Sequence, residues 1–149
     1  MNKQIKDLIS TIKKIDIVKI TDEESLDDDT KVMRFENKDE QFFMMIKNIS
    51  EEYIVINTSN PVSLEEMHFN KPIKDLVNDF NTFAVGTKAI ISDEEKSHFL
   101  FVREEIIRVK DVLNKDLVKA RISLSLDLIK SAIKVFETIN DEIKENGKA

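Results

Sequence analysis

Apolar residues recur along this chain at two different spacings, and each spacing predicts a different kind of element. Near the start, apolar residues three and four positions apart alternate with lysines, which predicts an amphipathic helix over residues 2–16. A second run with this period opens at Pro72 and predicts a short helix over residues 72–82. The longest run extends from Asn114, whose side chain suits an N-cap, to Glu145 without proline or glycine. It predicts a long closing amphipathic helix.

Between these helices the apolar period changes to two, which predicts strands. Polar turns separate the first two strands and the last two, so each pair predicts a hairpin. Pro61 is expected to end the third strand because proline lacks the N–H that a sheet needs. The acidic segment at residues 21–30 has almost no apolar content and is expected to form a solvated loop. The predicted strands lie at residues 31–36, 41–47, 53–57, 83–92 and 97–107.

Strands and helices follow one another in separate runs, in the order α-β-β-β-α-β-β-α. This arrangement is typical of an α+β protein, with an antiparallel sheet of about five strands and a long C-terminal amphipathic helix. No linker or repeat divides the sequence, so we expect a single domain over residues 1–149. Gly86 falls inside a predicted strand, which indicates a bulge or a close backbone contact.

Composition narrows the possible partners. The formal net charge of −6 opposes binding to a phosphate backbone, so nucleic acid is not an expected partner. The absence of cysteine excludes disulfides and thiol chemistry. Charged residues interrupt every apolar stretch before the roughly 18 residues that a membrane helix needs, and the first ten residues lack the apolar core of a signal peptide. We therefore expect a cytoplasmic protein that binds no membrane.

A search for catalytic residues finds none. His68 and His98 are the two histidines, and neither has further ligands at zinc-binding spacing. The sequence contains neither a G-x-S-x-G motif nor a glycine-rich phosphate loop. Glu104 and Glu105 are neighbours on a predicted strand and would point to opposite faces, so they cannot share a proton. We expect no enzymatic activity, no cofactor and no metal.

The second predicted strand is apolar on both faces. Phe43 and Met45 point to the face opposite Phe42 and Met44, so this strand is covered on both faces by the protein's own helices or partly by another molecule. Each such side chain left in water would forgo roughly 1.5–3 kcal/mol, and open apolar faces usually serve as interfaces. The residues expected to contact a partner are Phe43, Met45, Tyr53 and Val55 on the sheet, and Ile5, Leu8 and Ile12 on the first helix.

The element order, the acidic charge and the closing helix resemble the type III secretion chaperone-like fold, and in particular its YbjN-like family. The most specific part is the helix residues 75–81 (DLVNDFN), followed by the hairpin from Phe83 to Val102. Asn81 is interpreted as a residue that tolerates the left-handed conformation at a helix end. The resemblance implies a non-enzymatic protein, commonly a homodimer, whose relatives hold a segment of a client protein on apolar patches of the sheet and the first helix.

These observations predict a protein-binding module of the chaperone or adaptor type, which holds a partner segment on an apolar sheet face. A homodimer is expected. The alternative is a regulatory or stress-related domain that binds a small ligand between the sheet and the helices.

Overall fold

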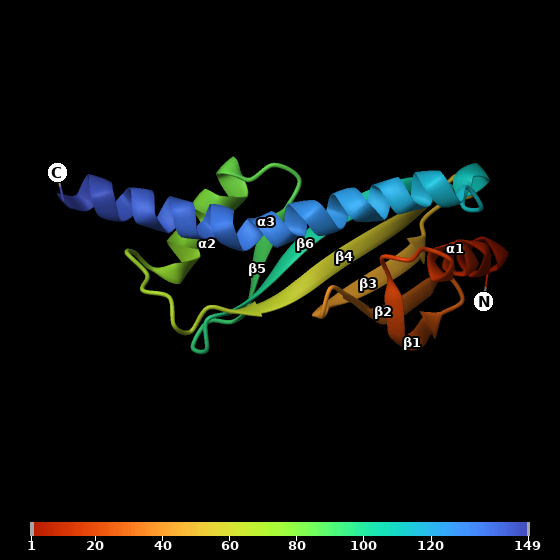
Figure 1. The fold of residues 1–149 in the computed structure, drawn as a ribbon, viewed down its shortest axis with the longest axis horizontal. Coiled ribbons are helices and arrows are strands. Elements are labelled where there is room, and N and C mark those ends of the chain that lie inside the picture. The colour runs from red at the N-terminus through yellow and green to blue at the C-terminus, as the bar shows by residue number, and fades with distance from the viewer. Residues whose placement is uncertain (1, 149) are drawn as a thin grey trace. The chain divides into compact units, whose positions relative to one another are not determined.

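The computed structural model describes residues 2–148 and combines helices with an antiparallel sheet (Figure 1). It confirms the predicted α+β class and the long C-terminal helix, with six strands in the described residues rather than about five. The additional strand precedes the three predicted ones. In chain order the elements are α1 (Lys3–Lys13), β1 (Lys19–Asp27), β2 (Thr30–Asn37), β3 (Glu40–Asn48), β4 (Tyr53–Ser63), α2 (Ile73–Phe83), β5 (Lys88–Asp93), β6 (His98–Arg108), the short 3-10 helix η1 (Val109–Asp111) and α3 (Lys115–Lys148).

The chain divides into two compact units, and each unit is built from two separate stretches of sequence. Unit 1 contains residues 1–59 and 104–126, and unit 2 contains residues 60–103 and 127–149. The strand order is β1-β2-β3-β4-β6-β5, and β4, β6 and α3 each contribute residues to both units. A single domain over the whole chain stays a prediction.

The acidic segment that we expected to be a solvated loop is the edge strand β1. It pairs with β2 from Lys19↔Glu36 to Asp27↔Thr30, with two irregularities in register. Aspartate and glutamate have low strand propensity, but pairing with a strong neighbouring strand overrides it, and at an edge their carboxylates remain in water. A charged edge also discourages pairing with the sheet of another molecule.

The predicted hairpin of β2 and β3 is confirmed. Lys38 and Asp39 connect the strands and have positive φ values of 50° and 67°, as a two-residue type I′ turn requires. The following strand β4 begins at Tyr53 as predicted but continues through Pro61, which we expected to end it. Its ladder with β3 ends at Ser59, so Pro61 removes no hydrogen bond from that ladder.

Gly86 lies in the loop between α2 and β5, because β5 starts at Lys88 and not at Phe83 as predicted. The φ of Gly86 is +75°, which glycine adopts without strain. Arg103 Nη1 donates a hydrogen bond of 2.9 Å to the Gly86 carbonyl, and a Cβ at this position would overlap the Arg103 guanidinium. The close contact expected at this glycine therefore exists, but a side chain makes it.

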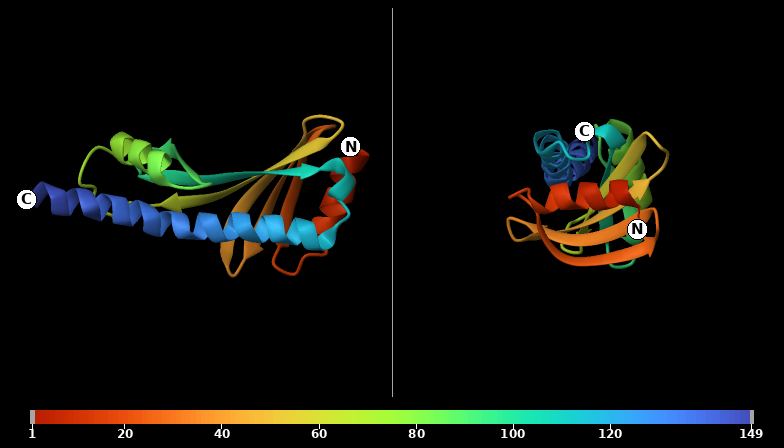
Figure 2. Two further views of the ribbon diagram at one scale, coloured as in Figure 1. Left: turned by 90° about the horizontal axis from the view of Figure 1, so that it is seen from above. Right: turned by 90° about the vertical axis from the view of Figure 1, so that its right-hand side faces the viewer.

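In unit 1, helices cover one face of the strands. Helix α1 begins at Asn2, whose side chain accepts hydrogen bonds from the N–H groups of Gln4 and Ile5, and it runs across the strands (Figure 2). The first turns of α3 start at Asn114, whose side chain accepts from the Leu117 N–H at 3.1 Å and so confirms the predicted N-cap. The fully buried core of this unit includes Ile5, Leu8, Ile12, Met33, Phe35, Phe42, Met44, Ile46, Ile54, Val118 and Ile122.

In unit 2, aromatic rings form the core. The Phe136 ring lies 5.5 Å from Phe99, 5.8 Å from Phe80 and 6.3 Å from Phe101, measured between centroids. Helix α2 is fixed to β5 by Asn81, whose side chain accepts from the Ala89 N–H and donates to the Ala89 carbonyl. The left-handed conformation that we expected at Asn81 is wrong, because Asn81 lies inside α2 and its φ is not positive. Its side chain instead bonds to the backbone of the edge strand β5.

Candidate functional site

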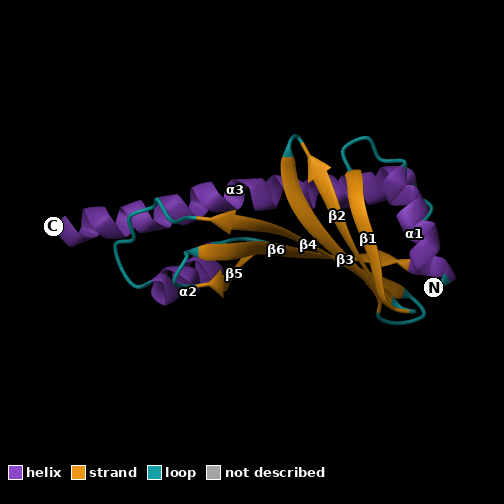
Figure 3. Cartoon of the chain, turned by 90° about the horizontal axis from the view of Figure 1, so that it is seen from below, coloured by secondary structure: helices purple, strands orange, loops and turns teal. Residues whose placement is uncertain are grey.

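The two faces of β3 differ in exposure. Phe42, Met44 and Ile46 are buried beneath the helices of unit 1, whereas Met45 is 42% exposed on the other face. Figure 3 views the strands from that second side, where β1, β2 and β3 stand in front of α3 and no described helix crosses them. Strand β3 is apolar on both faces, and the helices of unit 1 therefore cover only one of these two faces.

The structure brings the four predicted sheet residues onto this uncovered face. Met45 and Tyr53 are exposed, and Phe43 and Val55 are half-buried. The register supports their placement on one face, because Lys47, two residues after Met45, pairs with Val55.

The three helix residues behave differently. Ile5, Leu8 and Ile12 are fully buried in the core of unit 1, on the covered side of the strands. The prediction that they contact a partner is wrong, because the amphipathic stripe of α1 is used entirely within the protein. A helical stripe of this kind shows which residues are buried, but not whether another molecule buries them.

Two further apolar residues complete the surface. Val32 on β2 pairs directly with Met45. Ile106 on β6 is 57% exposed. Backbone bonds from Leu64 N–H to Ser97 and from Val109 N–H to Glu52 set the antiparallel register of β4 and β6, in which Ile106 lies opposite Val55. The bond of 3.3 Å between Asn57 Nδ2 and Glu104 Oε1 agrees with this register. The sequence places Ile106 on the same face of its strand as Glu104, two residues earlier, and the structure shows that both are exposed while Glu105 between them is buried. We name this surface the open-face patch: Val32, Phe43, Met45, Tyr53, Val55 and Ile106.

Charged residues surround the open-face patch. The Arg34 guanidinium lies 5.3 Å from the centroid of the Phe43 ring, a cation–π contact, and Arg34 pairs with Asp22 on β1. On the same strand, hydrogen bonds lower two carboxyl pKa values. Lys13 lowers the pKa of Glu23, and the Asp29 N–H lowers that of Asp27. Both carboxylates therefore stay ionised to lower pH than is usual. Glu23, which pairs with Lys13 of α1 and lies opposite buried Met33, is on the covered face rather than beside the patch.

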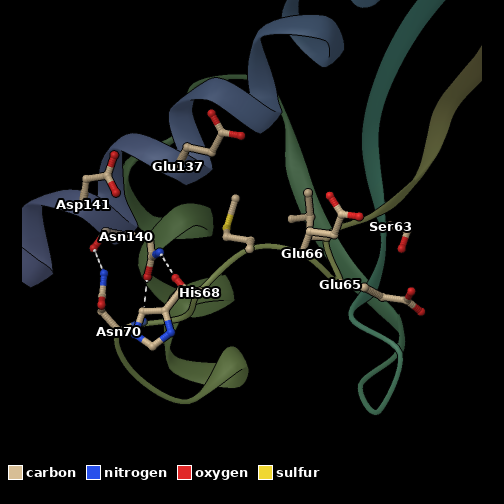
Figure 4. Close-up of a pocket in the computed structure, with 10 residues that line it drawn as sticks. Ser63, Glu65, Glu66, His68, Asn70, Glu137, Asn140 and Asp141 are labelled. Atoms are coloured by element: carbon tan, nitrogen blue, oxygen red, sulfur yellow. Dashed lines mark hydrogen bonds between the residues drawn. The ribbon is translucent and has the colours of Figure 1, made fainter.

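Unit 2 contains a pocket of about 670 Å³ between the segment from Ser63 to Asn70 and helix α3 (Figure 4). Asn140 holds its two sides together. The Asn140 side chain accepts from the Asn70 N–H at 2.9 Å and donates to the His68 carbonyl at 2.7 Å, while its backbone carbonyl accepts from the Asn70 side chain. The carboxylates of Glu65, Glu66, Glu137 and Asp141 also line the pocket.

Replacing Asn140 with leucine should destabilise the protein by about 1–3 kcal/mol, because the Asn70 N–H and the His68 carbonyl would lose their partners in a partly buried setting. Urea unfolding measures the change, and faster hydrogen exchange at the Asn70 amide would locate it. The exposed neighbour Asp141, changed to alanine, serves as the control and should leave both readouts unaltered. Equal exchange in the two variants would show that Asn140 does not hold this segment.

Among the described residues, no three histidine, aspartate or glutamate side chains are arranged to hold a metal ion. His98 Nε2 lies 3.5 Å from Glu65 Oε1 on the surface, and His68 contributes its backbone carbonyl to the Asn140 contact. In the part of the chain described, no helix is long and apolar enough to cross a membrane.

Comparison with known proteins supports the fold. The solved structure of an uncharacterized protein from Methanothermobacter thermautotrophicus is similar to this chain, with a TM-score of 0.50 and 13% sequence identity over 96% of this chain and 98% of that one. No family model and no curated protein matches the sequence. At this identity the similarity concerns the arrangement of helices and strands alone.

Proposed function

We propose that this protein is a non-enzymatic protein-binding module of the chaperone or adaptor type, and that it holds a segment of a partner protein on the open-face patch. The observation that carries the proposal is the contrast across β3, where one face is fully buried and the other presents exposed Met45. The resemblance to the YbjN-like family and homodimer formation belong to the same proposal.

Energetics support an interface on this face. Full burial of an apolar side chain contributes roughly 1.5–3 kcal/mol, and Met45, Tyr53 and Ile106 each leave more than a third of their surface in water. A partner that covers them would recover part of that energy. Methionine and tyrosine also suit such a surface, since the first adapts its shape and the second combines a large apolar ring with a polar end.

The double variant Met45→Asp, Ile106→Asp should lose a partner that the wild-type protein captures from a lysate of its native host. Mass spectrometry of the captured proteins measures this, and the loss should be at least about tenfold because central interface residues dominate binding. Leu113→Asp provides a matched control, since Leu113 is exposed and apolar but lies outside the patch. Unchanged capture by the double variant would contradict the proposal, and recovery of the protein itself alone would identify a second copy as the partner.

The alternative function, recognition of a small ligand, is favoured by the pocket beside Asn140. Its lining residues include carboxylates but no lysine or arginine, so a ligand there would carry positive charge. A thermal-shift screen of cationic metabolites separates the two functions. A pocket binder should raise the melting temperature at saturating ligand, whereas a module that works through the open-face patch should show no shift.

A further inference from the structure

Lysines gather on the outer surface of unit 1, around a hollow of about 650 Å³ beside helix α1. We name this hollow the lysine pocket, and the residues that line it are Lys6, Ile9, Ser10, Lys13, Lys14 and Lys31. Its volume lies in the range of roughly 300–1,000 Å³ that is usual for ligand sites. The chain as a whole has a net charge of −6, so this concentration of positive charge is a local feature.

The helical period of α1 brings three of these lysines together. Residues three and four positions apart lie on the same side of a helix, which places Ser10 between Lys6, Lys13 and Lys14. The apolar stripe of α1 faces the core, so these three lysines are exposed. Lys31 reaches the pocket from β2, and only 16% of its side chain is exposed.

One carboxylate neutralises part of this charge. Glu23 of β1 contacts Lys13 Nζ through Oε1 at 2.7 Å and Lys31 Nζ through Oε2 at 3.4 Å. These contacts hold two of the ammonium groups beside the pocket. Among the residues that the structure describes, Lys6 and Lys14 have no ion-pair partner. The pocket therefore keeps an excess of positive charge that its own surroundings do not cancel.

The other carboxylates close to α1 in sequence do not change this balance. Asp16 pairs with Lys119 of α3 at 3.0 Å, and Asp7 does not line the pocket. A ligand of the pocket must therefore carry negative charge.

The chemistry of the lining favours phosphate among anions. A phosphate group carries a charge of about −1.5 to −2 and three strong acceptor oxygens, so several ammonium groups can contact it together, whereas a carboxylate carries one charge. Hydrogen bonds from lysine to phosphate are roughly twice as strong as bonds between neutral groups. The Ser10 hydroxyl lies among the lysines and adds a donor.

The position of the pocket favours a small soluble molecule over a membrane or a nucleic acid. A helix that lies on a membrane inserts its apolar side into the lipid, but Ile5, Leu8 and Ile12 of α1 are fully buried in the core. Nucleic acids are bound through many phosphate contacts along an extended basic surface, and the lysine pocket is confined to one helix and one neighbouring strand.

We propose that the lysine pocket binds a soluble molecule with two or more linked phosphate groups. Lys6 and Lys14 are eight residues apart, which is about 12 Å along the helix axis and more than a single phosphate group spans. Lys13 and Lys31, held by Glu23, contact the same ligand from the side of the sheet. The site is independent of the function proposed for the open-face patch, which lies on the opposite face of the strands.

Isothermal titration calorimetry of the full chain with inorganic triphosphate at low salt tests the proposal. The wild type should bind one triphosphate per chain, and it should bind citrate, a carboxylate of similar charge, at least about tenfold more weakly. The double variant Lys6→Gln, Lys14→Gln should bind triphosphate at least about tenfold more weakly than the wild type. Glu23→Gln should strengthen binding about threefold, because it removes the competing carboxylate.

The double variant Lys88→Gln, Lys96→Gln is the matched control. It removes the same charge from two exposed lysines of unit 2 that do not line the pocket, so the affinity should stay within about twofold of the wild type. All four lysines are exposed, so circular dichroism should show both double variants folded.

Equal affinity for triphosphate and citrate would overturn the proposal, because the attraction would then be common to all anions. Equal weakening by the two double variants would overturn it as well, since only the net charge of the chain would matter. Sedimentation with vesicles that contain about 25% phosphatidylserine gives the third outcome: binding that triphosphate does not displace would assign the lysines to a membrane surface and reject the soluble ligand. None of these substitutions touches the open-face patch, so failure here leaves that proposal standing.

Discussion

Replacing Met44 with aspartate should unfold the protein at room temperature, whereas the same replacement at Met45 should leave it folded. Met44 is fully buried between β3 and the helices of unit 1, while Met45 is 42% exposed on the opposite face. The buried variant loses roughly 2–5 kcal/mol of packing and also places an unpaired carboxyl in an apolar core. Together these costs approach the entire stability of a typical domain, about 5–15 kcal/mol.

Circular dichroism during thermal unfolding compares the two variants directly. The Met45→Asp protein should melt cooperatively within about 5 °C of the wild type, since surface substitutions usually change stability little. If both variants unfolded, both faces of β3 would be core, and the open-face patch would not exist. If both folded, the covered face would be less tightly packed than the structure shows.

Replacing Phe136 with alanine should lower the free energy of unfolding by about 3–5 kcal/mol. Four other rings surround Phe136, so its removal leaves a cavity that the rigid neighbours cannot fill. Each lost ring contact also removes about 0.5–1.5 kcal/mol beyond the buried area.

Urea unfolding of the Phe136→Ala variant measures this loss, and Phe83→Ala is the matched control. The two substitutions remove the same atoms, but Phe83 is exposed, so its removal should cost less than about 1 kcal/mol. A loss below about 1 kcal/mol for Phe136 would show that the aromatic cluster does not stabilise unit 2.

Elements with a strong apolar period were predictable from the sequence. Helix α3 and its N-cap at Asn114 follow from local patterns, as does the hairpin of β2 and β3. Strand β1 could not be recognised because its residues carry no apolar alternation, and only pairing with β2 makes it a strand. The extension of β4 past Pro61 likewise depends on a distant neighbour, because its ladder with β3 ends at Ser59 and only β6 borders it on the other side. Such features are set by neighbours distant in sequence, which local propensity does not record.

The candidate site was only partly predictable, because the covering of a strand face also depends on elements that are distant in sequence. Alternation along β3 shows that Met45 and Phe43 share a face, but it does not show which face the helices cover. Ile5 and Leu8 carried an equally strong apolar signal and proved to be core. The role of Asn81, which pairs with the backbone of Ala89, has no local signature, because it depends on how α2 meets β5.

The central claim is that the open-face patch binds another protein, and a photo-crosslinking amino acid at position 45 tests it most directly. After irradiation in the native host, the account predicts a crosslinked band that contains a second protein, and no such band when the same amino acid replaces Leu113, an exposed apolar residue outside the patch. A crosslink to a protein of different sequence at position 45 alone would support the claim. Identical patterns at the two positions, or no crosslink at position 45, would contradict it.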